Sequence, residues 1–393
     1  MKDFRYLLRH RIKQLRRRIE RPRRFSSVRR AKPRIRRLAP AAWLAAPLLA
    51  GLLLPLAVVP LRGGQPAPPA VPQATASPAP PAPAAKEAPQ PKVSVYLSHS
   101  GQIETLPLEE YVSGVVAAEM PPGFELEALK AQAVAARTFI VRRLQAGDHS
   151  GVPVPGADVT DTVSHQAYVS KAALERKWTR GGRSAELAKI RRAVLETRGV
   201  VMTYQGQPIT ASFFASSGGY TENSEDYWNA AVPYLRSVAS PWDQDITPNL
   251  AVTYTFSNAE LIQKLGIAAA ALPASRDLAA SGPAKPVSSS SASGLPAEVL
   301  SLTAGHRVQK ISIGGTVFTG REVREKLGLR SSQFTWKRKE NKVLITTYGN
   351  GHGVGMSQWG ANGMARQGST ATQILKHYYS GISFNQVSTL LKK

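Results

Sequence analysis

The chain has 393 residues, a formal net charge of +25 and no cysteine. Its length leaves room for two domains of about 150 residues with segments to spare, and the absence of cysteine excludes disulfides and thiolate metal sites. The charge favours a polyanionic partner such as nucleic acid, anionic lipid or cell wall.

The first 37 residues hold 17 Lys and Arg against Asp3 and Glu20, a net charge of 17 − 2 = +15. An uncharged stretch of 24 residues, Leu38–Leu61, follows directly and is rich in Leu, Ala and Val. At about 1.5 Å per residue, it is long enough for a hydrocarbon core of about 30 Å. We therefore expect residues 1–37 to form a basic cytoplasmic tail and Leu38–Leu61 a single transmembrane helix in the cell membrane, with the remaining chain extracytoplasmic.

A cleaved signal peptide is the rival interpretation of this segment. Its basic region would be unusually long, its apolar core would be too long, and no clear small-x-small cleavage site precedes the next segment. We therefore favour an uncleaved anchor. Residues 62–91 are rich in Pro and Ala and predict an extended linker.

The globular part begins with a predicted hairpin and two helices. Val93–Leu97 and Ile103–Leu106 alternate between apolar and polar residues as strands do. Apolar residues at helical spacing predict a first helix from Leu108, which Pro121-Pro122 end. A second helix is expected from about residue 125 to residue 144.

Glu119 lies just before the break between these helices, where a carboxylate can point into a cleft. Lys130 and Arg137 are seven residues apart, so they project from one face of the second helix. A carboxylate beside two cations suits acid catalysis on an anionic or polyhydroxyl substrate. Surface pairing of Glu119 with Arg137 is the alternative. Glu109 and Glu110 are interpreted as the acidic start of the first helix, with a second catalytic carboxylate as their alternative role.

A predicted hairpin, Val200–Tyr204 with Ile209–Phe213, leads into a polar loop. Glycines there permit unusual backbone angles and the close approach of a ligand. An ordinary long turn is the alternative to sugar recognition. The residues expected to bind sugar in this loop are Ser216, Ser217, Gly218, Gly219, Thr221, Glu222 and Asn223.

Residues 249–341 read as a variable unit. Ser257 is expected to cap a short helix, and Thr319 and Glu322 form a capping box that opens another. The charges of Gly320–Ser331 are interpreted as an exposed helix face. Residues 268–299 are rich in Ala, Ser and Pro and predict a flexible insertion.

After a predicted strand, Val343–Tyr348, comes the string GNGHGVGMSQWGA at residues 349–361. Its glycines suit a backbone that wraps a ligand closely, and it lacks the Gly-Lys-Ser/Thr ending of a phosphate loop. A closing helix is expected over Gly363–Tyr379. The residues of the string expected to contact substrate are His352, Ser357, Gln358 and Trp359.

Five stretches resemble the stage II sporulation protein D family, also called amidase enhancer, over residues 93–384. They are Leu108–Arg143, the D-x-x-x-x-Q-x-Y stretch Asp161–Tyr168, the S-G-G-x-T-E loop Ser217–Glu222, Gly320–Ser331 and the G-H-G-x-G-M-S-Q-x-G-A string Gly351–Ala361. The resemblance implies that His165, Gln166 and Tyr168 line a glycan groove.

The resemblance also implies a lytic transglycosylase, which cleaves the bond between N-acetylmuramic acid and N-acetylglucosamine and leaves a 1,6-anhydro end. One carboxylate suffices for this reaction, and Glu119 takes that role, with Lys130 and Arg137 positioning the glycan or stabilising the departing charge. Many relatives carry His and Cys near the start of the polar loop, with an associated metal. Phe214 and Ser217 stand there in this chain, so we expect no metal or other cofactor.

The resemblance further implies a setting in spore engulfment. The partners it implies are peptidoglycan glycan strands, a peptidoglycan amidase and a multi-spanning membrane protein. We expect an α+β fold, a mixed two-lobed extracytoplasmic domain with a central cleft. Residues 92–248 and 342–386 would form its catalytic region, and residues 249–341 a second lobe.

Three other functions stay open at the level of sequence. One is a non-catalytic glycan-binding protein that enhances an amidase. Another is a nucleic-acid-binding membrane protein that works through its N-terminal arginines, although we expect no nucleic-acid partner. The third is a metallohydrolase using His165 and His352, which lack His-x-x-x-His spacing.

Overall fold

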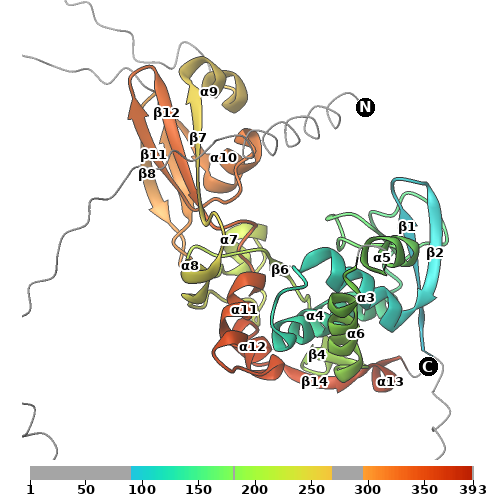
Figure 1. Cartoon of the computed structure of the whole chain (residues 1–393). Helices are drawn as coiled ribbons and strands as arrows, with labels where there is room; N and C mark the ends of the chain where they lie inside the picture. Colours follow the sequence, from blue (N-terminus) through green and yellow to red (C-terminus); the bar gives the residue numbers. More distant parts are fainter. Residues whose placement is uncertain (1–89, 180–181, 268–294, 392–393) are drawn as a thin grey trace, which may run out of the picture. The chain divides into compact units, whose positions relative to one another are not determined.

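Figure 1 shows the computed structural model, which describes residues 90–179, 182–267 and 295–391. Contacts divide the chain into Met1–Ala82 and Pro83–Lys393, and the described residues all belong to the second part. The expected tail 1–37, transmembrane helix Leu38–Leu61 and nearly all of the linker lie outside the described residues. Within the described ranges, no helix is both long and apolar enough to cross a membrane.

The predicted hairpin and the helix–break–helix pattern are confirmed. Strands β1 (Lys92–Leu97) and β2 (Gln102–Pro107) pair antiparallel, and β3 (Val159–Thr160) joins β1 in parallel. Helix α3 (Leu108–Glu119) ends where the next residue turns extended ahead of Pro121, and α4 (Leu126–Ala146) follows. Glu119 is therefore the last residue of α3.

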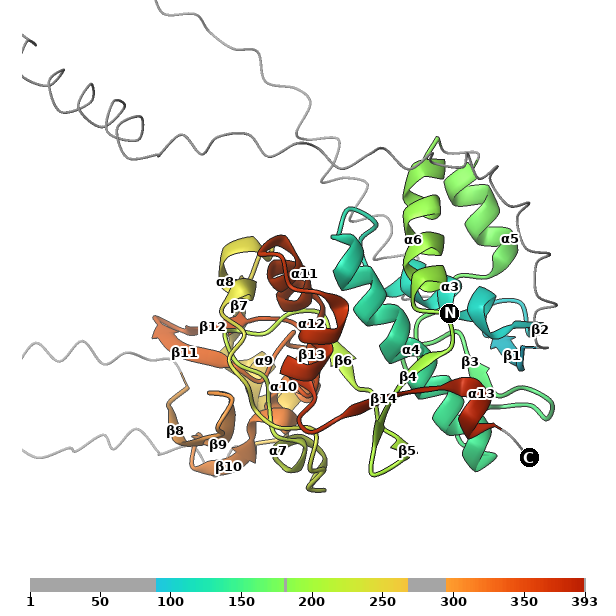
Figure 2. The same ribbon diagram turned by 90° about the horizontal axis from the view of Figure 1, so that it is seen from below.

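Helix α4 is the centre of the larger hydrophobic core. Figure 2 shows it running beside α6 (Ser184–Glu196). It also contacts α3, β4 (Val200–Tyr204), α11 (Gln358–Arg366) and α12 (Ala371–Tyr378). Its alanines, among them Ala131, Ala133 and Ala136, are fully buried, and their small side chains allow close packing on several sides. Before α6 the chain forms α5 (Lys171–Leu174) and a π-helical turn, Glu175–Thr179.

The expected hairpin forms, but its second strand begins at Gln207 and does not run through Ile209–Phe213. β4 (Val200–Tyr204) lies between β14 (Ser383–Gln386) and a two-residue strand, β5 (Gln207–Pro208). Ile209 still donates its N–H to the Met202 carbonyl over 3.2 Å, but the Met202 N–H donates to the Thr138 hydroxyl over 2.9 Å, so the ladder does not continue. β6 (Phe213–Phe214) pairs in parallel with β13 (Met356–Ser357), which brings the two glycine-containing loops together.

Between these loops the chain makes a unit with its own hydrophobic core, here called the inserted subdomain, residues 251–348. Two three-stranded sheets, ordered β10-β9-β8 and β11-β12-β7, pack with α9 and α10. The Gly349 N–H donates to the Leu250 carbonyl over 2.9 Å, so the ends of the subdomain are adjacent. Its elements are β7 (Ala251–Ser257), α9 (Asn258–Leu265), β8 (Ala297–Leu302), β9 (Val308–Ile313), β10 (Thr316–Thr319), α10 (Gly320–Leu327), β11 (Phe334–Lys339) and β12 (Lys342–Tyr348).

Both predicted caps in the subdomain are confirmed, because Ser257 and Thr319 each form a complete capping box. The expected insertion extends too far, since β8 already begins at Ala297; residues 268–294 lie outside the described residues.

The remaining helices are short. α7 (Ser224–Trp228) and α8 (Trp242–Ile246) precede the inserted subdomain, and α11 (Gln358–Arg366), α12 (Ala371–Tyr378) and α13 (Val387–Leu390) follow it. The single helix expected over Gly363–Tyr379 is wrong. Gly368 adopts a φ of +88°, which is outside the helical region and separates α11 from α12.

Candidate functional site

A pocket of about 760 Å³ is lined by side chains from both the larger core and the inserted subdomain. That volume is within the range of small-ligand sites, roughly 300–1,000 Å³. The lining residues used below are Glu119, His165, Gln166, Phe214, Tyr227, Trp228, Arg321, Arg324, His352 and Gln358. Glu119 is the only carboxylate among the described residues that line this pocket.

Glu119 is held by two hydrogen bonds. Its Oε1 accepts from the Ala167 N–H over 2.9 Å, and its Oε2 accepts from Gln358 Nε2 over 3.3 Å. Burial raises the pKa of Glu119 above the ordinary carboxyl value, and the two hydrogen bonds oppose that rise to a smaller extent. The acid form therefore persists to higher pH than in an exposed glutamate, which suits proton donation.

Gln358 is fixed in place because it begins a capped helix. Ser357 precedes α11, and its Oγ accepts from the Gly360 N–H while donating to Asp243 Oδ1 over 2.7 Å. Gln358 itself is 5% exposed, and its amide also reaches Gln132 Oε1 at 3.5 Å. The direction of the amide toward Glu119 is thus set by the helix start.

Asp243 joins the two glycine-containing loops, and the sequence analysis missed it. Its fully buried carboxylate accepts hydrogen bonds from the hydroxyls of Ser217 (2.8 Å), Ser240 (2.6 Å) and Ser357 (2.7 Å). Ser217 and Ser357 were expected to contact substrate. Both are fully buried, and they instead hold their loops to Asp243.

The expected sugar-binding residues of the polar loop after β6 are not among the residues that line this pocket, and they make contacts within the protein. Ser216 forms an antiparallel bridge with Asn350, and Thr221 exchanges hydrogen bonds with Val238. Asn223 bonds Asp226 and the Ser237 N–H. Side chains of Gln333 and Gln244 approach the loop's two glycines, Gly218 and Gly219.

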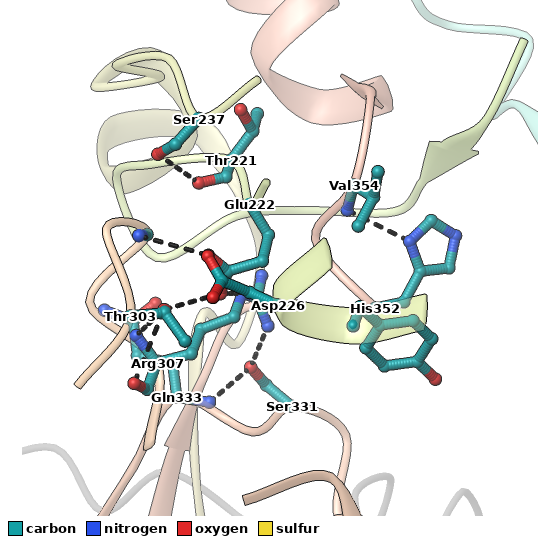
Figure 3. A network of polar contacts seen from close by, with 12 residues as sticks. Thr221, Glu222, Asp226, Ser237, Thr303, Arg307, Ser331, Gln333, His352 and Val354 are labelled. Atoms are coloured by element: carbon teal, nitrogen blue, oxygen red, sulfur yellow. Dashed lines mark hydrogen bonds and ion pairs between the residues drawn. The ribbon is translucent and has the colours of Figure 1, made fainter. Parts of the chain in front are cut away.

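Glu222 is fully buried at the junction with the inserted subdomain (Figure 3). Its Oε2 accepts from the Thr303 hydroxyl over 2.7 Å, and its Oε1 accepts from the Gly305 N–H over 3.2 Å. The Glu222 N–H donates to the Gly353 carbonyl over 2.8 Å, so this loop also supports the loop that carries His352.

His352 lines the pocket among aromatic rings. Its ring centroid lies 5.5 Å from those of Tyr227 and Trp228 and 5.7 Å from that of Phe214. Burial, with the nearby charges of Arg307 and Arg324, lowers the pKa of His352 to about 3. The ring is therefore neutral at pH 7.

Both pocket histidines use their ring nitrogens within the protein. His352 Nδ1 accepts from the Val354 N–H, and His165 Nδ1 accepts from the Thr160 N–H, so both Nδ1 lone pairs are used within the protein. Neither Nδ1 is therefore free to bind a metal. In the described ranges, no group of three or more His, Asp or Glu side chains is arranged to hold a metal ion.

The structure does not bring Lys130 and Arg137 to Glu119. Arg137 is fully buried and pairs with Glu109 through Nη2 and Oε2, 2.6 Å apart, and it also donates to two backbone carbonyls. Lys130 pairs with Glu127 and Glu196 instead. The face of α4 that carries Lys130 and Arg137 packs against α3 and α6 and does not line the pocket.

Two further expected contacts lie elsewhere. Tyr168 is buried, stacks on Tyr111 at 5.5 Å and donates to Glu104 Oε2 over 2.7 Å, outside the pocket lining. Trp359 packs edge-on against Phe124 with ring centroids 4.7 Å apart. Gln166, by contrast, lines the pocket.

The pocket also contains residues that the sequence analysis missed or interpreted otherwise. Tyr227 and Trp228 come from α7, and the Trp228 side chain is 37% exposed. Arg321 and Arg324 come from α10, whose charges were interpreted as an exposed face. No local signal distinguished them, since their position depends on how the inserted subdomain packs.

Comparisons with known proteins agree with the resemblance seen in the sequence. A family model described as "Stage II sporulation protein" matches residues 96–204. Stage II sporulation protein D of Bacillus amyloliquefaciens is 47% identical over 309 residues, 78% of this chain and 82% of that protein. The protein of the same name from Bacillus subtilis (strain 168) is 47% identical over 304 residues, 77% of this chain and 81% of that protein.

A more distant relative is the "Amidase enhancer" of Bacillus subtilis (strain 168). It is 31% identical over 317 residues, which cover 69% of this chain and 39% of that protein. Together with the fold, these matches define the chain first as a sporulation-family protein of mixed α and β structure. More specifically, the chain belongs to the stage II sporulation protein D family.

Proposed function

We propose that this chain is a lytic transglycosylase that cleaves the bond between N-acetylmuramic acid and N-acetylglucosamine in peptidoglycan during spore engulfment. The observation that carries the proposal is one carboxylate, Glu119, in a pocket large enough for sugar rings and oriented by Gln358. Hydrolytic glycosidases of the usual kind need a second carboxylate, roughly 5–9.5 Å from the first. The described lining offers none, which favours a reaction with one acid–base group.

The proposed reaction balances without water. Protonated Glu119 gives its proton to the glycosidic oxygen as the bond to C1 of the muramic acid breaks. The C6 hydroxyl oxygen of the same sugar then bonds to C1, and the C6 hydroxyl proton passes to the Glu119 carboxylate. The acid is restored, and the products are a 1,6-anhydro end and a free C4 hydroxyl.

Aromatic side chains supply the surface for sugar binding in this proposal. Tyr227 and Trp228 line the pocket, and Trp228 is partly exposed, so it is accessible to a sugar ring. Lys130 and Arg137 have no place in the proposed site, because their ion pairs hold them in the protein.

The proposal extends to the setting of the enzyme. Leu38–Leu61 would anchor a two-lobed extracytoplasmic domain to the cell membrane, with the pocket between the lobes. A peptidoglycan amidase is the proposed partner, which the name of the amidase enhancer relative supports. The multi-spanning membrane protein is proposed on the resemblance alone.

The test is mass spectrometry of peptide-free glycan strands after incubation with the full-length protein. Anhydro-muramyl ends are expected from the wild type, and Glu119→Gln is expected to lose roughly 100- to 10,000-fold in rate, the usual contribution of a general acid. An unchanged melting temperature of the variant would show that the fold is kept. Reducing ends in place of anhydro ends would contradict the proposal.

A second candidate is a non-catalytic, glycan-binding amidase enhancer, which the same relative's name favours. In that case neither protein yields cleaved glycan, and Glu119→Gln stimulates the amidase as well as the wild type does.

A further inference from the structure

Helix α10 presents two arginines to the pocket. Arg321 and Arg324 are three residues apart, so they lie on one face of the helix, and both line the pocket that contains Glu119. The inserted subdomain thereby contributes positive charge to a site whose acid belongs to the larger core.

The two arginines differ in whether a carboxylate of the protein pairs with them. Arg321 pairs with Glu325 over 2.8 Å, and its Nη1 donates to the Tyr227 carbonyl over 2.9 Å. Arg324 donates from Nη1 to the Tyr227 hydroxyl over 3.1 Å, and within the described residues it has no carboxylate partner. Its Nε is buried without a hydrogen-bond acceptor. A buried charged donor without an acceptor is costly, so the protein satisfies the Arg324 guanidinium only in part.

The surroundings of Arg324 do not offset its charge. Arg307 and Arg324 both act to lower the pKa of His352, which leaves that ring neutral. The one carboxyl in the described lining, Glu119, has a raised pKa. Two arginines in the described lining thus stand against one carboxyl, which favours an anionic ligand group.

Guanidinium matches a carboxylate especially well, since its planar N–H groups pair with both oxygens. A strand of alternating N-acetylglucosamine and N-acetylmuramic acid has one acidic group per repeat, the carboxyl of the lactyl ether on the muramic acid. That group is ionised when free and is neutral when joined to an amine as an amide. Resting on the proposed function, we propose that Arg324, assisted by Arg321, binds the free lactyl carboxylate of the muramic acid at the scissile bond.

Arg324 is then a specificity-determining residue, and the inserted subdomain takes part in substrate choice. The substrate comparison that isolates this contact uses peptide-free glycan oligomers with free lactyl carboxylates. Their matched counterparts are the same oligomers after conversion of those carboxylates to methylamides.

The experiment is calorimetric titration of full-length Glu119→Gln, which binds glycan without consuming it, with both oligomers. Adding Arg324→Gln is expected to weaken binding of the carboxylate oligomer by roughly 10- to 100-fold, because a charge-assisted hydrogen bond is lost. Binding of the methylamide oligomer should stay within about twofold. Arg324→Lys keeps the charge but loses the planar guanidinium group. Its affinity for the carboxylate oligomer should therefore lie between those of the Arg324 protein and Arg324→Gln.

Lys264→Gln is the matched control, since it removes one exposed charge from α9 of the same subdomain. Equal weakening of both oligomers by Arg324→Gln, or no weakening of either, would overturn the proposal. The titration measures binding alone. Its result therefore tests the Arg324 contact independently of whether the wild type cleaves glycan.

Discussion

Arg307 and Glu222 form an ion pair in the protein interior, with Nε 3.6 Å from Oε2 and both side chains 2% exposed. Figure 3 shows Arg307 reaching Glu222 on one side and Ser331 on the other. Arg307 precedes β9 of the inserted subdomain, whereas Glu222 belongs to the loop after β6. The pair therefore joins the inserted subdomain to the segment that supports His352.

Glu222→Gln should lower the free energy of unfolding by about 3–5 kcal/mol, because it leaves the buried charge of Arg307 uncompensated. Urea unfolding of the full-length protein measures this loss. The double variant Glu222→Gln with Arg307→Met should be more stable than the sum of the single effects predicts. Additive losses would show that the two side chains are energetically independent.

The pH dependence of activity should report on Gln358. The Gln358 amide donates to Glu119 and stabilises the charged carboxylate, so Gln358→Met should raise the pKa of Glu119 further. A reaction that needs the acid form declines as pH rises through that pKa. The basic limb of the kcat/KM profile should therefore move to higher pH, although the rate falls with the lost orientation.

Gln263→Met, at an exposed position on α9, is the control for this profile. If the basic limb of Gln358→Met stays in place or moves to lower pH, the Gln358 amide does not lower the pKa of Glu119, and the prediction is wrong.

Substitution of Gly353 by alanine tests how tightly the loop that carries His352 packs against Arg307. Its φ is +93°, and an added Cβ would lie 2.4 Å from Arg307 Nε. Gly368 has a similar φ of +88°, but nothing lies within 4 Å of its added Cβ. Gly368→Ala should cost about 1–3 kcal/mol from backbone strain alone. Gly353→Ala should cost about 1–3 kcal/mol more, because the side chain adds a clash.

Thermal unfolding of the two glycine variants supplies the comparison. Equal shifts in melting temperature would mean that Arg307 moves aside freely and does not position the loop.

Arg137 should act on stability and not on substrate binding. Arg137→Met leaves Glu109 without its buried partner, so a loss of about 3–5 kcal/mol in unfolding free energy is expected. KM should be unchanged at a temperature where the variant is folded. A large rise in KM with unchanged stability would restore the glycan-binding role inferred from the sequence.

Local signals in the sequence predicted most elements of the fold. The prolines after Glu119 and the capping boxes at Ser257 and Thr319 act over a few residues, so they can be read directly. The boundary of the β4 hairpin could not, because it depends on the hydroxyl of Thr138, which lies 64 residues away from Met202 and accepts its N–H.

The candidate site was predictable only in part for the same reason. Glu119, His352 and Gln358 were identified from their own stretches. The buried roles of Arg137 and Ser357 depend on Glu109 and Asp243, which lie 28 and 114 residues away. Arg324 reaches the pocket only through the packing of a whole subdomain, and no spacing within α10 reveals that.

The hydrogen bond between Gly349 and Leu250 means that the chain leaves the larger core and returns to it at one spot. A stretch with adjacent ends can be lengthened, shortened or exchanged without rerouting the rest of the protein. Because Glu119 lies outside that stretch and Arg321 and Arg324 lie inside it, evolution can replace the arginine-bearing part of the pocket as one block while Glu119 and its surroundings are inherited unaltered.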